Sequence, residues 1–182
     1  AYEMRGRYER AIAVYRQGIA VKPDFAPAYH TLGRTYVRVG RYAEAVKACK
    51  KAIALEPDLA PAYIDLGLAY DRLKLYQQAV DAYGKAIAIE PRMETAHVNL
   101  GVTYYKLGRY ADSVAAYRKA IALKPNSAGS YYGIAVAQDR LGRPAEAVAA
   151  LEQAVRLDPR GQIGLRAAGL LERIRRRPPK TE

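Results

Sequence analysis

The chain has 182 residues, of which 51% are hydrophobic, and its 30 lysines and arginines against 18 acidic residues give a formal net charge of +12. This balance is typical of a globular protein and excludes a disordered chain. The single cysteine, Cys49, also excludes an intrachain disulfide framework and a metal site built from cysteines.

Apolar stretches are short throughout the chain. Charged residues or proline interrupt each of them before the roughly 20 residues that a membrane-spanning helix needs. Residues 1–5 show neither the charged start nor the apolar core of a secretory signal. We therefore expect no membrane insertion, and the compartment is left open, with the cytoplasm favoured.

An internal repeat runs through the sequence with a constant spacing. Proline recurs at this spacing, each time after an apolar helical stretch, at Pro23, Pro57, Pro91, Pro125 and Pro159. Other residue types recur in the same register, at Leu32, Leu66 and Leu100, at Gly33, Gly67 and Gly101, and at Tyr36, Tyr70 and Tyr104. Within one repeat these positions are one or three residues apart, so they share one face of a helix, and that face must be buried.

The N-terminal segment, residues 1–25, reads as a partial repeat. We expect residues 1–5 to be the last turn of a first helix and residues 9–22 to form the complete second helix. Ala11, Tyr15 and Gly18 would then lose their cover and leave an apolar face. A trimmed chain, a missing segment or self-association through these three residues would each explain such a face.

Four full repeats follow, at residues 26–59, 60–93, 94–127 and 128–161, and each reads as helix, tight turn, helix and proline-terminated loop. Gly40, Gly108 and Gly142 supply the left-handed residue that ends a first helix, and Pro144 suits the first turn of the next one. Lys74 stands where the turn glycine belongs, and a left-handed lysine would cost about 1–2 kcal/mol.

The C-terminal segment begins like a further repeat but lacks its second helix. Residues 162–177 are amphipathic and predict a capping helix, and residues 178–182 form a tail. We expect the repeats and the cap to form one continuous domain.

The repeat resembles the tetratricopeptide repeat family. The family pattern of an aromatic residue, Leu-Gly, Tyr, Ala, an aromatic residue, Ala and Pro is met at Tyr63, Leu66, Gly67, Tyr70, Ala79, Tyr83, Ala86 and Pro91. The resemblance implies an all-α fold, a right-handed α-solenoid of helix-turn-helix repeats. It also implies a concave groove, lined by the first helices of the repeats, that binds a peptide or protein segment.

Catalytic chemistry has few candidates in this sequence. The only histidines are His30 and His97, and neither has a second metal-ligand type at a suitable spacing. Cys49 takes a column otherwise held by tyrosines and is most simply a small buried residue. No glycine-rich loop followed by Lys-Ser or Lys-Thr could hold a phosphate. We expect no enzymatic activity, no metal and no cofactor.

The groove is predicted from the positions on the first helices that avoid the buried columns. These candidate residues are His30, Arg34, Arg38, Asp65, Asp71, Arg72, Asn99, Tyr105, Lys106, Tyr132, Asp139 and Arg140. Tyr105 and Tyr132 fall outside the recurring tyrosine columns and are candidate anchors for a partner. Arg38, Arg72, Lys106 and Arg140 form a basic ladder that an acidic peptide would sense, although cations in the last turn of a helix also offset its macrodipole.

The sequence predicts a noncatalytic scaffold that binds a protein or peptide segment of acidic character. One alternative is a nucleic-acid or anionic-surface adaptor, because residues 160–182 carry seven cations, five of them Arg173, Arg175, Arg176, Arg177 and Lys180. Nucleic acid is disfavoured, since no recognition motif accompanies the charge. The other alternative is a substrate-recruiting segment of a larger enzyme.

Overall fold

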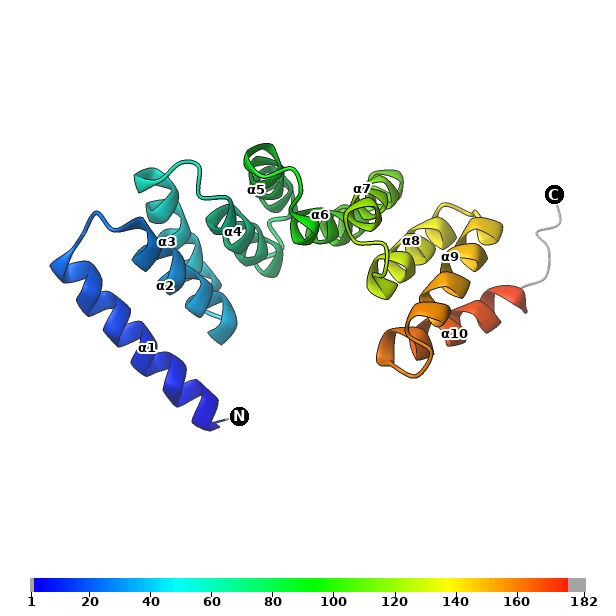
Figure 1. Ribbon diagram of the computed structural model, residues 1–182, viewed down its shortest axis with the longest axis horizontal. Coiled ribbons are helices and arrows are strands. Elements are labelled where there is room, and N and C mark those ends of the chain that lie inside the picture. Colours follow the sequence, from blue (N-terminus) through cyan, green and yellow to red (C-terminus); the bar gives the residue numbers. More distant parts are fainter. Residues whose placement is uncertain (1, 177–182) are drawn as a thin grey trace. The chain divides into compact units, whose positions relative to one another are not determined.

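The computed structural model describes residues 2–176, with side chains from residue 6 onward, and in this part of the chain the regular structure is entirely α-helical (Figure 1). The helices are α1 (Tyr2–Val21), α2 (Ala26–Val39), α3 (Tyr42–Leu55), α4 (Ala60–Arg72), α5 (Tyr76–Ile89), α6 (Glu94–Lys106), α7 (Tyr110–Leu123), α8 (Ala128–Arg140), α9 (Pro144–Leu157) and α10 (Gln162–Arg175). The predicted all-α repeat fold is confirmed. The predicted tail at 178–182 lies outside the described residues.

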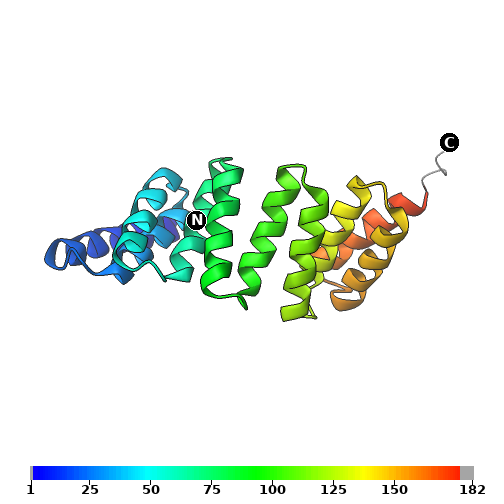
Figure 2. The same cartoon turned by 90° about the horizontal axis from the view of Figure 1, so that it is seen from above.

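The chain divides into two compact units, Ala1–Ala96 and His97–Glu182, and α6 begins in the first and continues in the second. In the first unit each helix from α1 to α5 packs on the next one, and α2 also contacts α4. In the second unit α7 to α10 pack in the same sequential way, and α8 also contacts α10 (Figure 2). First helices of successive repeats are therefore neighbours within each unit. The repeat boundaries and the single continuous domain remain predictions.

One feature of the first unit differs from the sequence-based expectation. Residues 2–21 form one uninterrupted helix, α1, where we expected a turn between residues 5 and 9. The turn glycines Gly40, Gly108 and Gly142 have φ values of 80°, 75° and 72°, whereas Gly6 keeps a helical conformation. A turn at Gly40 lets α2 pack on α3, but the described packing partner of α1 is α2. A break at Gly6 would therefore gain no packing. Keeping glycine inside a helix lowers stability by only about 1 kcal/mol relative to alanine, so α1 continues through it.

The two helices of a repeat meet where a glycine faces a larger side chain. A Cβ atom added at Gly67 of α4 would lie 2.5 Å from Cε1 of Tyr83 of α5, and one added at Gly33 would lie 2.5 Å from Sγ of Cys49. At Gly101 of α6 the corresponding distance to the ring of Tyr117 is 3.0 Å. The tyrosine rings therefore rest directly on the backbone of the neighbouring helix.

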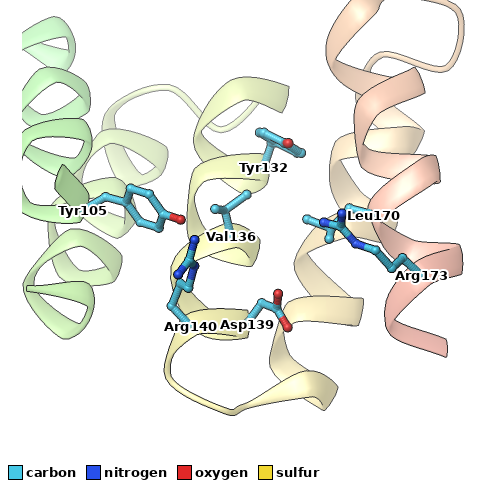
Figure 3. Close-up of a pocket in the computed structure, with 7 residues that line it drawn as sticks. All are labelled: Tyr105, Tyr132, Val136, Asp139, Arg140, Leu170 and Arg173. Atoms are coloured by element: carbon cyan, nitrogen blue, oxygen red, sulfur yellow. The ribbon is translucent and has the colours of Figure 1, made fainter. Parts of the chain in front are cut away.

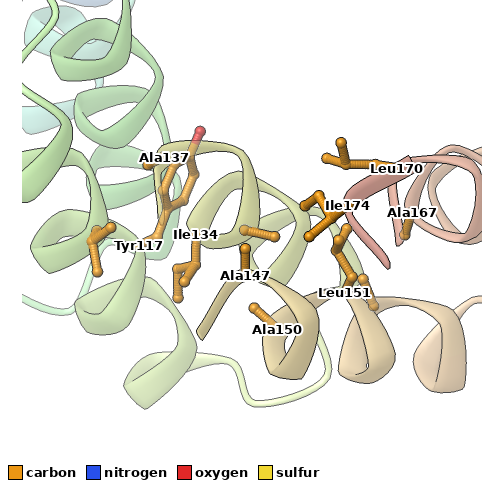
Figure 4. Close-up of a cluster of buried hydrophobic side chains, with 12 residues drawn as sticks. Tyr117, Ile134, Ala137, Ala147, Ala150, Leu151, Ala167, Leu170 and Ile174 are labelled. Atoms are coloured by element: carbon orange, nitrogen blue, oxygen red, sulfur yellow. The ribbon is translucent and has the colours of Figure 1, made fainter. Parts of the chain in front are cut away.

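Each unit has its own buried core. In the first unit one buried cluster has Ile12, Leu32 and Tyr36 as its largest members, so α1 contributes to this core through Ile12. In the second unit the core gathers around Tyr117, Leu151 and Leu170 with many alanines between them, and Figure 4 shows how these side chains fill the space between α7, α8, α9 and α10. Alanine at the other buried positions keeps the helices close.

The start of α10 is fixed by a side chain from the preceding loop. Oδ2 of Asp158 accepts hydrogen bonds from the backbone N–H groups of Ile163 and Gly164, at 3.1 Å and 3.2 Å. Two of the N–H groups that every helix start leaves unpaired are satisfied in this way. The carboxylate thus orients α10 relative to α9.

The contact between glycine and tyrosine predicts opposite effects for two substitutions in one repeat. Gly67→Ala should lower the free energy of unfolding by about 1–3 kcal/mol, because the new methyl group would overlap the Tyr83 ring. Gly84→Ala, on the exposed side of α5 with no atom near the added Cβ, should raise it by about 0.5–1 kcal/mol through helix propensity. Urea unfolding measures both, and equal effects would contradict the packing argument.

Lys74 has a φ of 62°, so the left-handed residue expected at this turn is confirmed. Lys74→Gly should therefore raise the free energy of unfolding by about 1 kcal/mol, since glycine adopts this conformation without steric strain. Lys85→Gly in the exposed interior of α5 is the control and should lower it by a similar amount. Thermal unfolding measures both variants. A Lys74→Gly variant that is no more stable than the wild-type chain would argue against strain at Lys74.

Candidate peptide-binding site

A pocket of about 520 Å³ lies on the first helices of the second unit (Figure 3). Its lining residues are Tyr105 of α6, Tyr132, Val136, Asp139 and Arg140 of α8, and Leu170 and Arg173 of α10. We call it the α8–α10 pocket. The direct packing of α10 on α8 brings the side chains of the two helices to one site.

The α8–α10 pocket combines apolar and charged groups. Val136 and the buried Leu170 supply the apolar part. Two guanidinium groups and one carboxylate supply charge, so the lining has a net charge of +1 from Arg140, Arg173 and Asp139. A ligand with both an apolar group and a negative charge fits this combination.

Tyr105 is held in place from two sides. Its ring centroid lies 5.3 Å from that of Tyr110, with a tilted geometry of 54°. On the other side, Cζ of Arg140 lies 5.9 Å from the centre of the Tyr105 ring, and Figure 3 shows the Tyr105 hydroxyl pointing toward this guanidinium group. The electrostatic interaction and the hydrogen bond with Tyr105 raise the pKa of Arg140, and the guanidinium is charged.

The structure brings together only some of the predicted groove residues. Tyr105, Tyr132, Asp139 and Arg140 line the α8–α10 pocket. Asn99 and Lys106 are not among its lining residues. Both tyrosines outside the recurring columns line this pocket, and their role as anchors for a partner stays a prediction.

Sequence reasoning missed Leu170 and Arg173. The signal was present, because Leu170 follows Val136, and Arg173 follows Asp139, at the same spacing that separates the repeated prolines. The interpretation of residues 162–177 as a cap does not extend the groove positions onto this helix. In the structure α10 supplies a wall of the pocket.

In the first unit, the predicted groove residues divide by charge. Nε2 of His30 on α2 lies 2.9 Å from Oδ2 of Asp65 on α4, and both side chains are nearly buried. Asp71 is also buried. The cationic candidates Arg34, Arg38 and Arg72 are instead exposed. The exposed side of α2 and α4 is therefore more basic than the sequence suggested, because its acids are withdrawn from the surface.

The cationic C-terminal run is partly paired. Arg175 contacts Glu152 of α9 at 2.6 Å, and Arg176 contacts Glu172 at 3.2 Å. These pairs are exposed and contribute little stability. Arg177 and Lys180 lie outside the described residues.

Cys49 is fully buried, which confirms its predicted place in the core. Burial raises the pKa of its thiol from an ordinary 9.0 to about 12, and the nearby charge of Asp65 adds to the effect. Within residues 2–176 no group of three His, Cys, Asp or Glu side chains is placed to hold a metal ion. None of the described helices has the length and apolar character to cross a membrane.

Models of the tetratricopeptide repeat match residues 24–91, 64–128, 98–162 and 132–180, and a TPR repeat model matches residues 1–40. The chain belongs to the tetratricopeptide repeat family. Membership supports a protein-interaction scaffold, a class of protein that is generally noncatalytic. No curated protein matches the chain.

Solved structures of several tetratricopeptide repeat proteins resemble this one. MamA is 29% identical, with a TM-score of 0.82, over 86% of this chain and 92% of that chain. TTC0263, a thermophilic TPR protein of Thermus thermophilus, is 24% identical, with a TM-score of 0.72, over 94% of both chains. YrrB, described as a TPR protein with an unusual peptide-binding site, is 20% identical, with a TM-score of 0.77, over 92% of this chain and 86% of that chain. The last two likenesses concern the fold alone.

The buried thiol predicts a specific pH dependence of stability. The folded state keeps Cys49 protonated up to about pH 12, whereas the unfolded chain ionises near pH 9.0, so stability falls as the pH rises through this range. The stability difference between the wild-type chain and Cys49→Ala should then shift by about 1 kcal/mol per pH unit against the wild type above pH 9. Urea unfolding at several pH values measures it, and a constant difference would show that the thiol titrates normally.

Proposed function

We propose that the chain is a noncatalytic scaffold that holds an acidic protein segment against the first helices of its repeats. The observation that carries this proposal is the α8–α10 pocket, in which Arg140 and Arg173 accompany an apolar lining. An extended segment with a carboxylate beside an apolar side chain satisfies both features. YrrB, a relative in fold, is described as having a peptide-binding site, which supports the class of ligand.

The charge of the first unit supports the same sign of ligand. On α2 and α4 the exposed groove candidates are the cations Arg34, Arg38 and Arg72, while Asp65 is paired with His30. Each unit by itself would therefore present a favourable potential to an acidic segment. Electrostatic attraction of this kind raises the association rate and selects the sign of the partner more than it adds affinity.

Aromatic residues supply the anchoring that charge does not. Tyr105 and Tyr132 line the pocket and are partly exposed. The Tyr110 ring and the Arg140 guanidinium fix Tyr105, so binding costs little side-chain entropy there. A partner side chain packing on these rings gains contact area at a pre-ordered site. The same binding would serve recruitment if the segment works within a larger enzyme.

Fluorescence anisotropy tests the proposal with three labelled peptides. One alternates Glu and Leu, and in the other two Gln or Lys replaces Glu. The Glu peptide should bind best and should weaken as salt rises, because its carboxylates pair with exposed arginines. Arg140→Glu and Arg173→Glu should each weaken its binding by about tenfold.

The control is Arg118→Glu, an equal change of charge on the exposed surface of α7, away from the pocket. It should leave the affinity within about twofold, as expected for a distant screened charge. Equal binding of the Glu and Gln peptides, or equal loss from the three charge reversals, would contradict a specific acidic ligand at this pocket.

A further inference from the structure

Within the described residues, no helix packs on the side of α1 or of α10 that faces the partner helix in a full repeat. The helix α1 aligns with the second helices α3, α5 and α7, and α10 aligns with the first helices α2, α4, α6 and α8. In the full repeats, the facing sides of the two helices are buried against each other. On α1 and α10 the corresponding sides are open.

The open side of α1 follows from comparison with α3. Ala45, Cys49 and Ala52 are fully buried against α2, whereas the aligned Ala11 and Tyr15 are half-buried and Gly18 is exposed. Next to them, 61% of Val14 and 87% of Val21 are exposed. This apolar face includes the three residues that the sequence marked for self-association.

The open side of α10 has the complementary character. Gly169 aligns with Gly33, Gly67 and Gly101, which all face a larger side chain, yet an added Cβ at Gly169 would meet no atom within 4 Å. Ala168 beside it is exposed, as is 63% of Leu165. This helix therefore presents the small-residue surface on which a second helix normally packs.

We propose that α10 of one copy of the chain packs against α1 of a second copy, so that the two helices complete a repeat across the interface. Tyr15 belongs to the column of Cys49, Tyr83 and Tyr117, and Gly169 belongs to the column of their glycine partners. The ring of Tyr15 would rest on Gly169 as Tyr83 rests on Gly67. Both halves of this contact, the ring of Tyr15 and the open backbone at Gly169, are already present in the chain.

Charge at the end of this contact supports the same pairing. In two of the four full repeats a loop arginine lies over a tyrosine of the first helix, with Arg41 at 4.7 Å from the Tyr36 ring and Arg109 at 4.5 Å from the Tyr104 ring. The aligned residues are Arg7 on α1 and Glu172 on α10. An ion pair between copies would replace the cation–π contact.

The neighbourhood of Arg7 strengthens this argument. Arg41 and Arg109 each pair with an acidic residue three positions later, Glu44 and Asp112. Three positions after Arg7 the chain has Arg10. The local acid is replaced by a second cation, so Arg7 and Arg10 together attract a carboxylate from outside their helix. Glu172 is exposed and pairs with Arg176 of its own helix at 3.2 Å, a surface pair of little stability, so Arg7 of a second copy would compete with Arg176 for this carboxylate.

The contact joins different surfaces of the two copies, so it is heterologous and leaves α1 free on one copy and α10 free on the other. Sedimentation equilibrium up to about 1 mM protein, where weak contacts are populated, should show an average mass that rises above the 20.1 kDa monomer without a plateau at the dimer. A monomer at every concentration would overturn the proposal.

The substitution Gly169→Gln distinguishes association through this interface from nonspecific association. Glutamine is a better helix former and has free space in the monomer, but it would occupy the site of the Tyr15 ring. It should weaken association by about tenfold or more while preserving the melting temperature. Gly84→Gln on the exposed side of α5 is the matched control and should leave association unchanged. Equal association of both variants would overturn the proposal.

Charge exchange tests the pairing directly. Glu172→Arg and Arg7→Glu should each weaken association by about fivefold, because each sets like charges against each other. The double variant carries the exchanged pair and should recover most of the loss at unchanged salt. Failure of the double variant to recover, with both single variants weakened, would show that these two residues do not meet.

Discussion

The contact between a glycine of one helix and a larger side chain of the next controls the geometry of the three repeats at residues 26–59, 60–93 and 94–127. At Gly67 the ring of Tyr83 occupies the space that any side chain would need, and the backbones of α4 and α5 approach accordingly. This approach sets which faces of the first helices are buried and which are exposed. Burying a tyrosine in this way also removes a large apolar area from water.

The position of the α8–α10 pocket follows from that packing. Because α8 and α10 are both first helices, they lie side by side, and their uncovered positions converge on one pocket. Arg140 and Arg173 come from the last turns of their helices, where a cation is also favourable for the helix dipole. Local helix electrostatics and the proposed binding of an acidic segment therefore favour the same residue type at these positions.

The sequence predicted most of the fold because its information is periodic. The columns of Gly33, Tyr36 and Pro57 recur in at least three successive repeats and specify helix faces, turns and even the left-handed Lys74. It did not predict the continuity of α1, since a turn glycine and a helical glycine differ only in the packing around them. Nor did it predict the pairing of His30 with Asp65, which depends on how two neighbouring repeats are rotated. Arg173 escaped sequence reasoning because a capping helix is not expected to line a groove.

The arrangement of the glycine and its tyrosine has a consequence for how such a chain can grow by gene duplication. Gly67 and Tyr83 belong to the same repeat, so a copied segment of one repeat length brings both halves of its main contact with it. A duplicated unit needs no compensating change in its neighbours to bury this ring. Insertion of whole units is thus far less disruptive than insertion of a few residues, which would separate each glycine from its ring.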